Sequence, residues 1–325
     1  EKVGAVCPLF LRGRGCPCPS NLHKAQSARQ RLDRLFLMED QQTTISVLIP
    51  HYNDSIRLRR CLEALMVQVD DRVQVIVADN GSDHALSDIQ HRWPTVLFID
   101  QPEKGAGPAR NAGAANVVSD WIAFLDADCV PDADWLHTAR AIASEGTVFG
   151  GSVRVFDETE PPRTGAEAFE AIFAFQIDSY LEKGFLPSCQ LVMARKDFER
   201  VGGFQANVSE DVDWSRRAVA AGLRLDIAHS LRVSHPSRSD WPALRRKWRR
   251  LVSEGFLLEG QGALRRLAWA GKAVTMPASV VAHAPRILRD GSLTPRDKLK
   301  AIGTLGRLRA TRMIWMIGQA VRNKP

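Results

Sequence analysis

Two carboxylates separated by one residue follow a short apolar run near the middle of the chain. Asp126 and Asp128 come directly after Trp121–Leu125, which has the length and composition of a buried strand. Because side chains of an extended segment repeat every two residues, both carboxylates are expected to point to the same side. Hard oxygen ligands of this kind suit Mg²⁺ or Mn²⁺, which bind one or two carboxylates together with water and phosphate oxygens. The pair is therefore a candidate for half of a metal–diphosphate site.

The same two residues also have an ordinary structural interpretation. Aspartate is common in turns and at helix N-termini. Asp132 and Asp134 precede a helical pattern and could start that helix. Asp126 and Asp128 would then be solvated turn residues. A D-x-D motif alone does not decide between the two interpretations, so the surrounding elements must.

The segments around this motif alternate between strand-like and helix-like patterns. Strands are predicted at Ile45–Ile49, Val73–Ala78, Val96–Ile99, Trp121–Leu125, Val148–Phe156, Gln190–Ala194, Leu225–Ala228 and Val233–His235. Helices are predicted at Leu58–Met66, Gly107–Val117, Asp132–Ile142, near Ala166–Leu181 and from Glu210 onward. This alternation predicts an α/β fold with a mostly parallel central sheet flanked by helices.

Ligands of an open parallel sheet bind beyond the carboxyl ends of its strands. Three of the predicted ends have polar or acidic clusters, at Pro50–Asp54, Asp79–Ser82 and Asp126–Asp128. A single aspartate after a strand is usually a turn residue. Three clusters at one edge of a sheet instead predict a binding site.

Several segments occur in an order that is typical of one enzyme family. They are ISVLIPHYN (45–53), VQVIVADNGSD (73–83), KGAGPARNAGA (104–114), WIAFLDADCVPDADWL (121–136), MARKDFERVGGF (193–204) and SEDVDWSRRAVAAG (209–222). Together they resemble the inverting glycosyltransferases of family 2, which have the Rossmann-like GT-A fold. The resemblance extends from residue 45 to about residue 235.

The resemblance implies a nucleotide pocket at the ends of the first two strands. Pro50, Tyr52 and Asn53 would line the base and ribose pocket, and Asp79 would read the uracil edge. His51 stands where the family often has a small hydroxyl residue, so the resemblance implies no role for it.

The resemblance also implies how the diphosphate would be held. Gly105 and Arg110 would lie over the nucleotide, where a glycine lets the backbone approach closely. Asp126 would contact the ribose or the metal, and Asp128 would bind the metal, Mn²⁺ or Mg²⁺. Many GT-A enzymes place a histidine near the metal or diphosphate at the position of His235, although a lone histidine is more often a core or surface residue.

A second acidic pair, Glu210 and Asp211, begins a predicted helix. Its ordinary interpretation is helix capping, with Ser209 as N-cap and the acidic residues favoured by the positive helix terminus. Inverting transfer needs one carboxylate to take the proton of the acceptor hydroxyl while the diphosphate leaves from the opposite face. The resemblance assigns that base to Asp211, with Glu210 orienting the acceptor or the loop.

Processive polysaccharide synthases of the family have a Q-x-x-R-W motif after the base. The nearest segment in this chain, RRKWRR (245–250), does not match that motif. We therefore expect a non-processive, hexosyltransferase-type enzyme.

The C-terminal part of the chain is strongly basic. Residues 241–325 contain 18 Lys and Arg against 4 Asp and Glu, whereas the whole chain has a net charge of +7. Tryptophan and aliphatic residues alternate with arginine at helical spacing in Trp241–Val252 and Leu305–Val321. Basic amphipathic helices with boundary tryptophans suit an anionic membrane surface. Packing on the catalytic domain, homodimerisation and nucleic-acid binding are the alternatives, and the acidic upstream domain disfavours nucleic acid.

The first 43 residues are expected to be a partly flexible N-terminal extension with a short helix at Gln26–Met38. Cys7, Cys16 and Cys18 lie there without a C-x-x-C pair, so neither a disulfide framework nor a zinc site is predicted. A reducing cytosolic compartment is the simplest expectation.

These features predict an N-terminal extension (1–43), a GT-A catalytic domain (44–240) and a basic amphipathic helical region (241–325). The expected function is metal-dependent, inverting transfer from a nucleotide-diphospho-sugar, expected to be UDP-linked. The acceptor would be a saccharide or lipid-linked saccharide in cell-surface polysaccharide or glycolipid assembly. The enzyme would be cytoplasmic and peripheral on the cytosolic membrane face. The alternative is a GT-A-like nucleotide- or lipid-binding protein without catalysis, against which the joint presence of Asp126, Asp128 and Asp211 argues.

Overall fold

The computed structural model describes residues 44–206, 208–259 and 262–322. These residues belong to one compact unit. The helix predicted at Gln26–Met38 and the three N-terminal cysteines lie outside the described residues.

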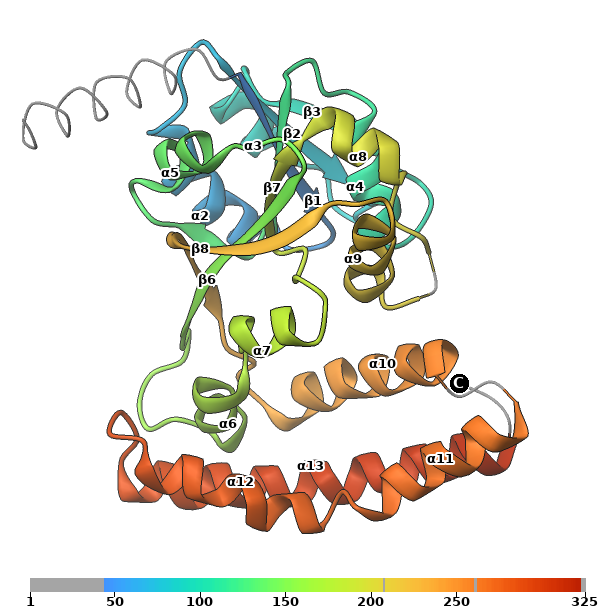
Figure 1. The fold of residues 1–325 in the computed structure, drawn as a ribbon. Helices are drawn as coiled ribbons and strands as arrows, with labels where there is room; N and C mark the ends of the chain where they lie inside the picture. The colour runs from blue at the N-terminus through green and yellow to red at the C-terminus, as the bar shows by residue number, and fades with distance from the viewer. Residues whose placement is uncertain (1–43, 207, 260–261, 323–325) are drawn as a thin grey trace, which may run out of the picture. The chain divides into compact units, whose positions relative to one another are not determined.

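A single mixed sheet forms the centre of this unit (Figure 1). Its strands are β1 (Ile45–His51), β2 (Val73–Asp79), β3 (Leu97–Asp100), β4 (Trp121–Leu125), β5 (Val130–Pro131), β6 (Thr147–Phe156), β7 (Gln190–Ala194) and β8 (Arg224–Pro236). Their order in the sheet is β3-β2-β1-β4-β7-β6-β8-β5. The two strands predicted at Leu225–Ala228 and Val233–His235 are both parts of β8.

Strands β3, β2, β1 and β4 run parallel to one another, and β6 runs parallel to β8. Strand β7 is antiparallel to both of its neighbours, β4 and β6. The register places His51 opposite Asp79, so the carboxyl ends of β1 and β2 lie side by side. The predicted α/β fold with a mostly parallel sheet is confirmed.

Helices cover both faces of the sheet. Successive strand residues, whose side chains point to opposite faces, therefore pack in two different hydrophobic clusters. Val47 and Ile49 pack in a cluster that includes Leu58 and Leu62, whereas Leu48 packs in one that includes Trp214. Strands buried on both faces read as continuous apolar runs, as those of β1 and β4 do. The helices of this part are α2 (Ser55–Met66), α3 (Ser87–Arg92), α4 (Ala106–Ala114), α5 (Trp135–Ile142), α6 (Gly165–Phe173), α7 (Ile177–Glu182), α8 (Arg195–Val201) and α9 (Glu210–Ala220).

The long helix predicted near Ala166–Leu181 is wrong, because the segment forms two helices, α6 and α7. A capping box between Thr164 and Glu167 starts α6. Between the two helices Phe175 adopts a left-handed backbone with a φ of 49°, which a continuous right-handed helix does not allow. Its ring packs on His235 with 4.6 Å between the ring centroids.

After β8 the described chain is helical, with α10 (Trp241–Glu259), α11 (Ala263–Val274), α12 (Ala278–Arg289) and α13 (Pro295–Arg322). Helix α13 packs against α6, α10, α11 and α12 (Figure 1). The buried carboxylate of Glu170 on α6 pairs with both Arg238 and Lys247. Within the described ranges, no helix is long and apolar enough to cross a membrane.

Candidate active site

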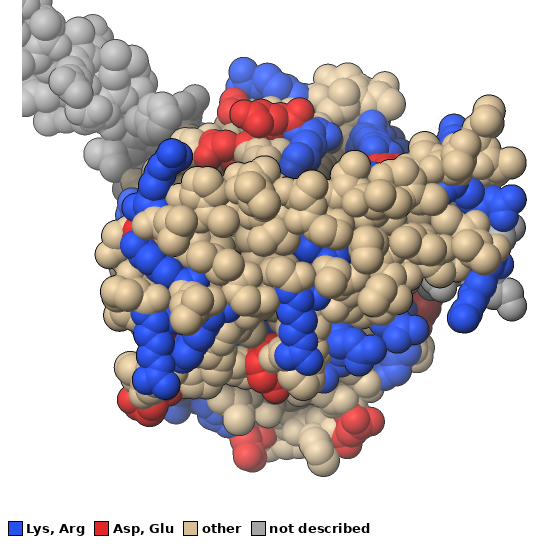
Figure 2. Space-filling view, turned by 90° about the horizontal axis from the view of Figure 1, so that it is seen from below, with Lys and Arg blue, Asp and Glu red and all other residues tan. Residues whose placement is uncertain are grey.

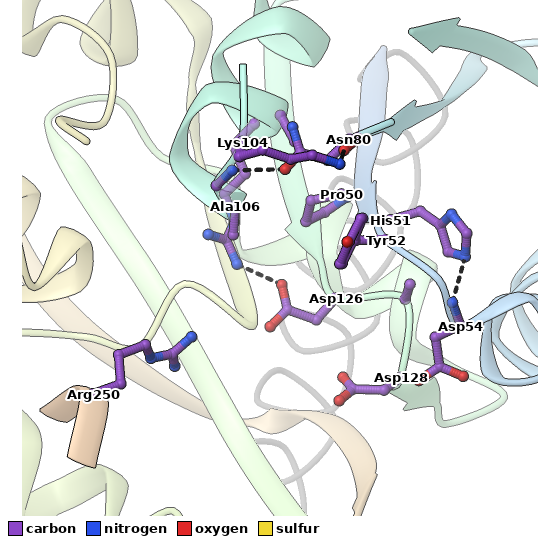
Figure 3. A pocket seen from close by; sticks show the side chains of 14 residues that line it. Pro50, His51, Tyr52, Asp54, Asn80, Lys104, Ala106, Asp126, Asp128 and Arg250 are labelled. Carbon is purple, nitrogen blue, oxygen red and sulfur yellow. Dashed lines mark hydrogen bonds and ion pairs between the residues drawn. The ribbon is translucent and has the colours of Figure 1, made fainter. Parts of the chain in front are cut away.

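A cavity of about 580 Å³ lies at the carboxyl ends of β1, β2 and β4 (Figure 3). The predicted residues that line it are Pro50, Tyr52, Gly105, Arg110, Asp126 and Asp128. The structure thus brings together residues that are far apart in the sequence, at the edge where an open α/β sheet binds its ligands. The predicted residues Asn53 and Asp79 do not line this cavity, although their neighbours in the sequence do.

Arg110 joins the two acidic motifs. The guanidinium places one terminal nitrogen 2.6 Å from Oδ1 of Asp126 and the other 2.6 Å from Oε1 of Glu210. Its side chain is only 3 % exposed. Burial acts to lower the pKa of Arg110, but the two carboxylates outweigh it and raise that pKa. Arg110 is therefore a permanent cation that holds both motifs in place.

The two aspartates of the D-x-D motif differ in electrostatic character. Burial raises the pKa of Asp126, and the neighbouring charge of Asp128 adds to this effect against the opposing pull of Arg110. Burial acts in the same direction on Asp128, but the hydrogen bond and charge of His235 outweigh it and lower the pKa of Asp128. Asp128 is thus the carboxylate that the site keeps ionised.

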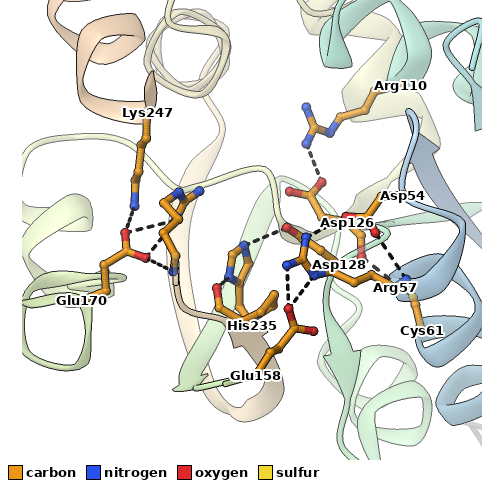
Figure 4. Close-up of polar contacts among 12 residues, drawn as sticks. Asp54, Arg57, Cys61, Arg110, Asp126, Asp128, Glu158, Glu170, His235 and Lys247 are labelled. Carbon is orange, nitrogen blue, oxygen red and sulfur yellow. Dashed lines mark hydrogen bonds and ion pairs between the residues drawn. The ribbon is translucent and has the colours of Figure 1, made fainter. Parts of the chain in front are cut away.

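The imidazole of His235 lies against the carboxylate of Asp128 (Figure 4). Its Nδ1 is 2.7 Å from the carbonyl oxygen of Pro236, which can only accept, so Nδ1 bears the hydrogen. In the neutral ring Nε2 then has a lone pair, and it faces Oδ2 of Asp128 at 3.2 Å. Two hydrogen-bond acceptors at this distance repel each other unless Nε2 of His235 is protonated or both atoms bind one cation.

This donor set fits a divalent metal ion. Two carboxylates and an imidazole are ligands that Mn²⁺ accepts, with the remaining positions left for phosphate oxygens and water. Within the part of the chain that the structure describes, no group of three or more His, Cys, Asp or Glu is already gathered as a complete metal cage. Asp128 and His235 are in contact, whereas Oδ1 of Asp126 is turned to Arg110.

His51, to which the sequence assigned no role, connects the ends of β1 and β2. Its Nε2 accepts the backbone N–H of Asp54 at 3.1 Å, so its Nδ1 must be the atom that donates to Asp79 at 2.8 Å. Ser82 donates to Asp79 as well, from its hydroxyl and its backbone. Burial acts to raise the pKa of Asp79, but these hydrogen bonds outweigh it and lower that pKa. Asp79 is therefore a fixed, ionised acceptor.

A polar network holds the loop that precedes α4. The buried amide of Asn80 donates to the carbonyls of Gln101 and Glu103 and accepts the N–H of Gly105 at 2.6 Å. Gly105 has a φ of 132°, a backbone conformation that favours glycine, and is the N-cap residue of α4. The N-terminus of α4 therefore faces the cavity, where its free N–H groups can receive an anion.

Lys104 and Tyr52 lie together at the edge of this cavity. The ammonium of Lys104 donates to the carbonyls of Asn80 and Gly81 and lies 4.4 Å from the centroid of the Tyr52 ring. The Tyr52 side chain is half exposed. Because Lys104 covers one face of the Tyr52 ring, the other face is available to a ligand.

Asp211 lies in a second cavity of about 250 Å³, which Glu210 and part of α10 also line. Its Oδ1 accepts the backbone N–H of Ser188 at 3.1 Å. Burial raises the pKa of Asp211, against the opposing charge of Arg110. A carboxylate with a raised pKa is a stronger base than a solvated one. The two cavities share Lys104, Gly105, Ala106 and Arg250 in their linings.

The polar clusters predicted at the strand ends include His51, Asp54 and Asn80, but no individual role was assigned to these residues. The sequence did not indicate Lys104 or Arg250 as lining residues. Arg250 comes from α10, and no pattern in the sequence indicates which face of a distant helix approaches the sheet.

The sequence of this chain is similar to those of known glycosyltransferases. The family model of glycosyl transferase family 2 matches residues 46–206. The chain is 30% identical to glycosyltransferase AglE of Haloferax volcanii over 218 residues, which are 63% of this chain and 71% of AglE. The chain belongs to glycosyltransferase family 2. This family 2 enzyme is also 36% identical over 208 residues to the succinoglycan biosynthesis protein ExoW of Rhizobium meliloti, covering 56% of the chain and 65% of ExoW.

Among solved structures, a S. aureus TarS 1-349 complex with UDP-GlcNAc is similar to the family 2 enzyme described here, with a TM-score of 0.49 and 13% identity. The match covers 86% of this chain and 92% of that one. Family membership confirms the resemblance predicted from the motifs, and with it a glycosyltransferase that acts on nucleotide sugars.

Proposed function

We propose that this family 2 glycosyltransferase is a metal-dependent, inverting and non-processive hexosyltransferase with a UDP-linked donor. Residues 44–240 would be the catalytic part. The observation that supports the proposal best is the division of carboxylates between two joined cavities. Asp126 and Asp128 line the first, Asp211 lines the second, and Arg110 and Glu210 connect them.

The first cavity has the features of a diphosphate site. Asp128, His235 and Asp126 would hold Mn²⁺ or Mg²⁺, which would neutralise charge on the leaving diphosphate. The N-terminus of α4 adds free N–H groups on the same side. Tyr52 and Pro50 give this cavity an apolar surface for a base and ribose.

The carboxylate of Asp79, at the neighbouring edge, favours uracil as the nucleobase of the donor. Its carboxylate is fixed by His51 and Ser82, and a carboxylate has more acceptor positions than these contacts use. A fixed acceptor can read an N–H group of the base. Asn53 would help to shape this edge, because it exchanges hydrogen bonds with Asp83 at 2.7 and 2.8 Å.

The chemical step then follows from the position of Asp211. Its carboxylate takes the proton of an acceptor hydroxyl, and the oxygen forms a bond to the anomeric carbon. The bond from that carbon to the diphosphate breaks, and the electron pair leaves with the nucleoside diphosphate. Attack opposite the leaving group inverts the anomeric centre. Glu210, fixed by Arg110, would orient the loop beside the base.

A second part of the proposal concerns the basic helices. The stripe predicted on α10 is used for internal packing, since Leu244 is buried in a cluster against which Trp248 packs and Val252 is buried in another. Figure 2, seen from below, shows a surface of mostly uncharged residues with lysines and arginines among them. The exposed aliphatic residues of α11, α12 and α13, here called the aliphatic face, are Leu264, Leu267, Val274, Val281, Leu288, Leu299, Ile314, Ile317 and Val321.

Exposed basic residues accompany this aliphatic face, among them Arg265, Lys272, Arg286 and Arg289. Aliphatic side chains beside cations suit anionic lipid headgroups over an acyl layer. We therefore propose a peripheral enzyme on the cytosolic face of a membrane, acting on a saccharide or lipid-linked saccharide in cell-surface polysaccharide or glycolipid assembly. A homodimer through the same face is the other outcome that a binding test could give.

The experiment that tests the proposed reaction is a donor panel of UDP-, GDP- and dTDP-sugars, with Mn²⁺ or with EDTA. The proposal predicts turnover of a UDP-sugar that EDTA abolishes. Metal-independent turnover, or preference for another nucleotide, would contradict the corresponding part. Nucleotide binding without turnover of any donor would favour the alternative of a non-catalytic GT-A-like protein.

A further inference from the structure

The second cavity adjoins the base but not the carboxylates of the D-x-D motif. Asp211 lines it, whereas Asp126 and Asp128 line only the first cavity. In an inverting transfer the acceptor oxygen must approach the anomeric carbon from the side opposite the diphosphate. If the diphosphate occupies the first cavity, the acceptor must therefore enter from the second.

One wall of the second cavity belongs to α10, which lies outside the segment that the family model matches. Arg250, Leu251 and Glu254 line it, and residues four apart lie on the same face of a helix. The opposite wall is formed by the beginning of α9, with Ser209, and by the first turn of α4. Helix α10 therefore closes one side of a space that residues of α4 and α9 line as well.

In this wall, positive charge compensates the carboxylate of Glu254 only in part. Its side chain is 21 % exposed, and its ion pair with Nε of Arg250 is long, at 3.5 Å. Burial is the main cause that raises its pKa to about 7; the charges of Glu210 and Asp211 act in the same direction and that of Arg250 against it. A carboxyl group placed beside two others gains most from a ligand that donates hydrogen bonds. Sugar hydroxyls are such donors.

We propose that the second cavity is the acceptor subsite and that Glu254 binds hydroxyl groups of a saccharide acceptor there. Arg250 stands at the junction of the two cavities and donates toward the same ring. Leu251 and Pro108 supply apolar contacts for its C–H faces. This inference rests on the proposed function, because it needs Asp211 to be the base. It adds the cavity that would receive the saccharide and Glu254 as a residue that would select it.

The test compares transfer with hydrolysis in one assay. The parent enzyme receives its preferred nucleotide sugar with Mn²⁺ and, as acceptors, the octyl glycosides of glucose, galactose, mannose and N-acetylglucosamine. The measured quantity is the ratio of glycosylated octyl glycoside to donor lost to water. In Glu254→Gln this ratio falls about tenfold, through a higher acceptor KM, because a charged hydrogen-bond partner is lost. Glu254→Asp recovers part of the ratio if the carboxylate is what matters.

Glu259→Gln is the matched control on the same helix. Glu259 is exposed and pairs with Lys272 at 3.2 Å, away from the cavity lining, so its ratio stays at the parent value. A ratio unchanged in Glu254→Gln, or transfer and hydrolysis falling in parallel, would overturn the proposal. So would a parent that hydrolyses its donor but glycosylates none of the four glycosides. A parent that turns over no nucleotide sugar would instead refute the proposed function.

Discussion

Arg110 lies 2.6 Å from Asp126 and is almost completely buried. Because the same guanidinium also contacts Glu210, one side chain links the D-x-D motif to the acidic pair at the start of α9. A buried cation between two partly exposed carboxylates costs desolvation, and this cost is offset only while both pairs are intact. The arrangement makes the geometry of the site sensitive to a single residue.

Arg110→Met is expected to lower the free energy of unfolding by about 3 kcal/mol, because it leaves two carboxylates without their cation. Urea denaturation measures the change. Arg92→Met is the control, since Arg92 forms an exposed pair with Glu63 at 3.3 Å and should cost less than about 1 kcal/mol. Equal losses in the two variants would mean that Arg110 is not an essential bridge.

Asp128→Asn should weaken binding of UDP in the presence of Mn²⁺ by about tenfold to a hundredfold, because the ionised member of the motif is lost. Calorimetry with UDP, with and without Mn²⁺, measures this. Asp134→Asn changes an aspartate that follows β5, is more than half exposed and should keep the parent affinity. An Asp128→Asn protein that still binds UDP more tightly with Mn²⁺ than without it would argue against the metal assignment.

Much of the fold was predictable because central strands such as β1 and β4 are buried on both faces. The runs at Ile45–Ile49 and Trp121–Leu125 have no competing helical interpretation, and they lie inside β1 and β4. The break between α6 and α7 was not predictable, because Phe175 takes a left-handed conformation that its residue type does not favour.

The site was predictable to the extent that it follows strand ends. Pro50, Tyr52, Asp126 and Asp128 line one cavity as the topology of a parallel sheet requires. The bridge from Arg110 to Glu210 spans 100 residues, and it depends on where α4 and α9 pack. Contacts of this kind, and the approach of Glu254 from α10, depend on tertiary packing that the sequence patterns do not specify.

The raised pKa of Glu254, about 7 against an ordinary value of 4.5, predicts a pH-dependent stability. Between these two values the folded protein binds the proton more tightly than the unfolded chain does, so this contribution to stability is lost as pH rises through the window. Glu254→Gln lacks the titration. Relative to this variant, the parent should lose about 1 kcal/mol between pH 4.5 and pH 8, after allowance for solvent screening.

Urea denaturation of both proteins at the two pH values measures the difference. The groups that face Glu254 are Arg250, Glu210 and Asp211, and all three are present in both proteins. An identical pH dependence in parent and variant would show that Glu254 titrates at its ordinary value.

Membrane attachment predicts flotation with vesicles that contain phosphatidylglycerol and little flotation with phosphatidylcholine alone. Leu264→Glu with Leu267→Glu should reduce flotation about tenfold, because both side chains are exposed on α11 and would insert charge into the acyl boundary. Val118→Glu alters an equally exposed residue of the catalytic part and should float like the parent. Equal flotation of all three proteins would contradict attachment through this face, and concentration-dependent self-association would favour a dimer.

Asp211 is proposed to be the base of an inverting glycosyl transfer, and the rate at which Asp211→Asn releases nucleoside diphosphate tests this role. The amide has nearly the same shape but does not take the acceptor proton. With the parent's preferred donor and Mn²⁺, we expect a rate at least about a hundredfold below that of the parent, in a protein that still binds UDP. A variant that turns over its donor at the parent's rate would show that Asp211 is not the base.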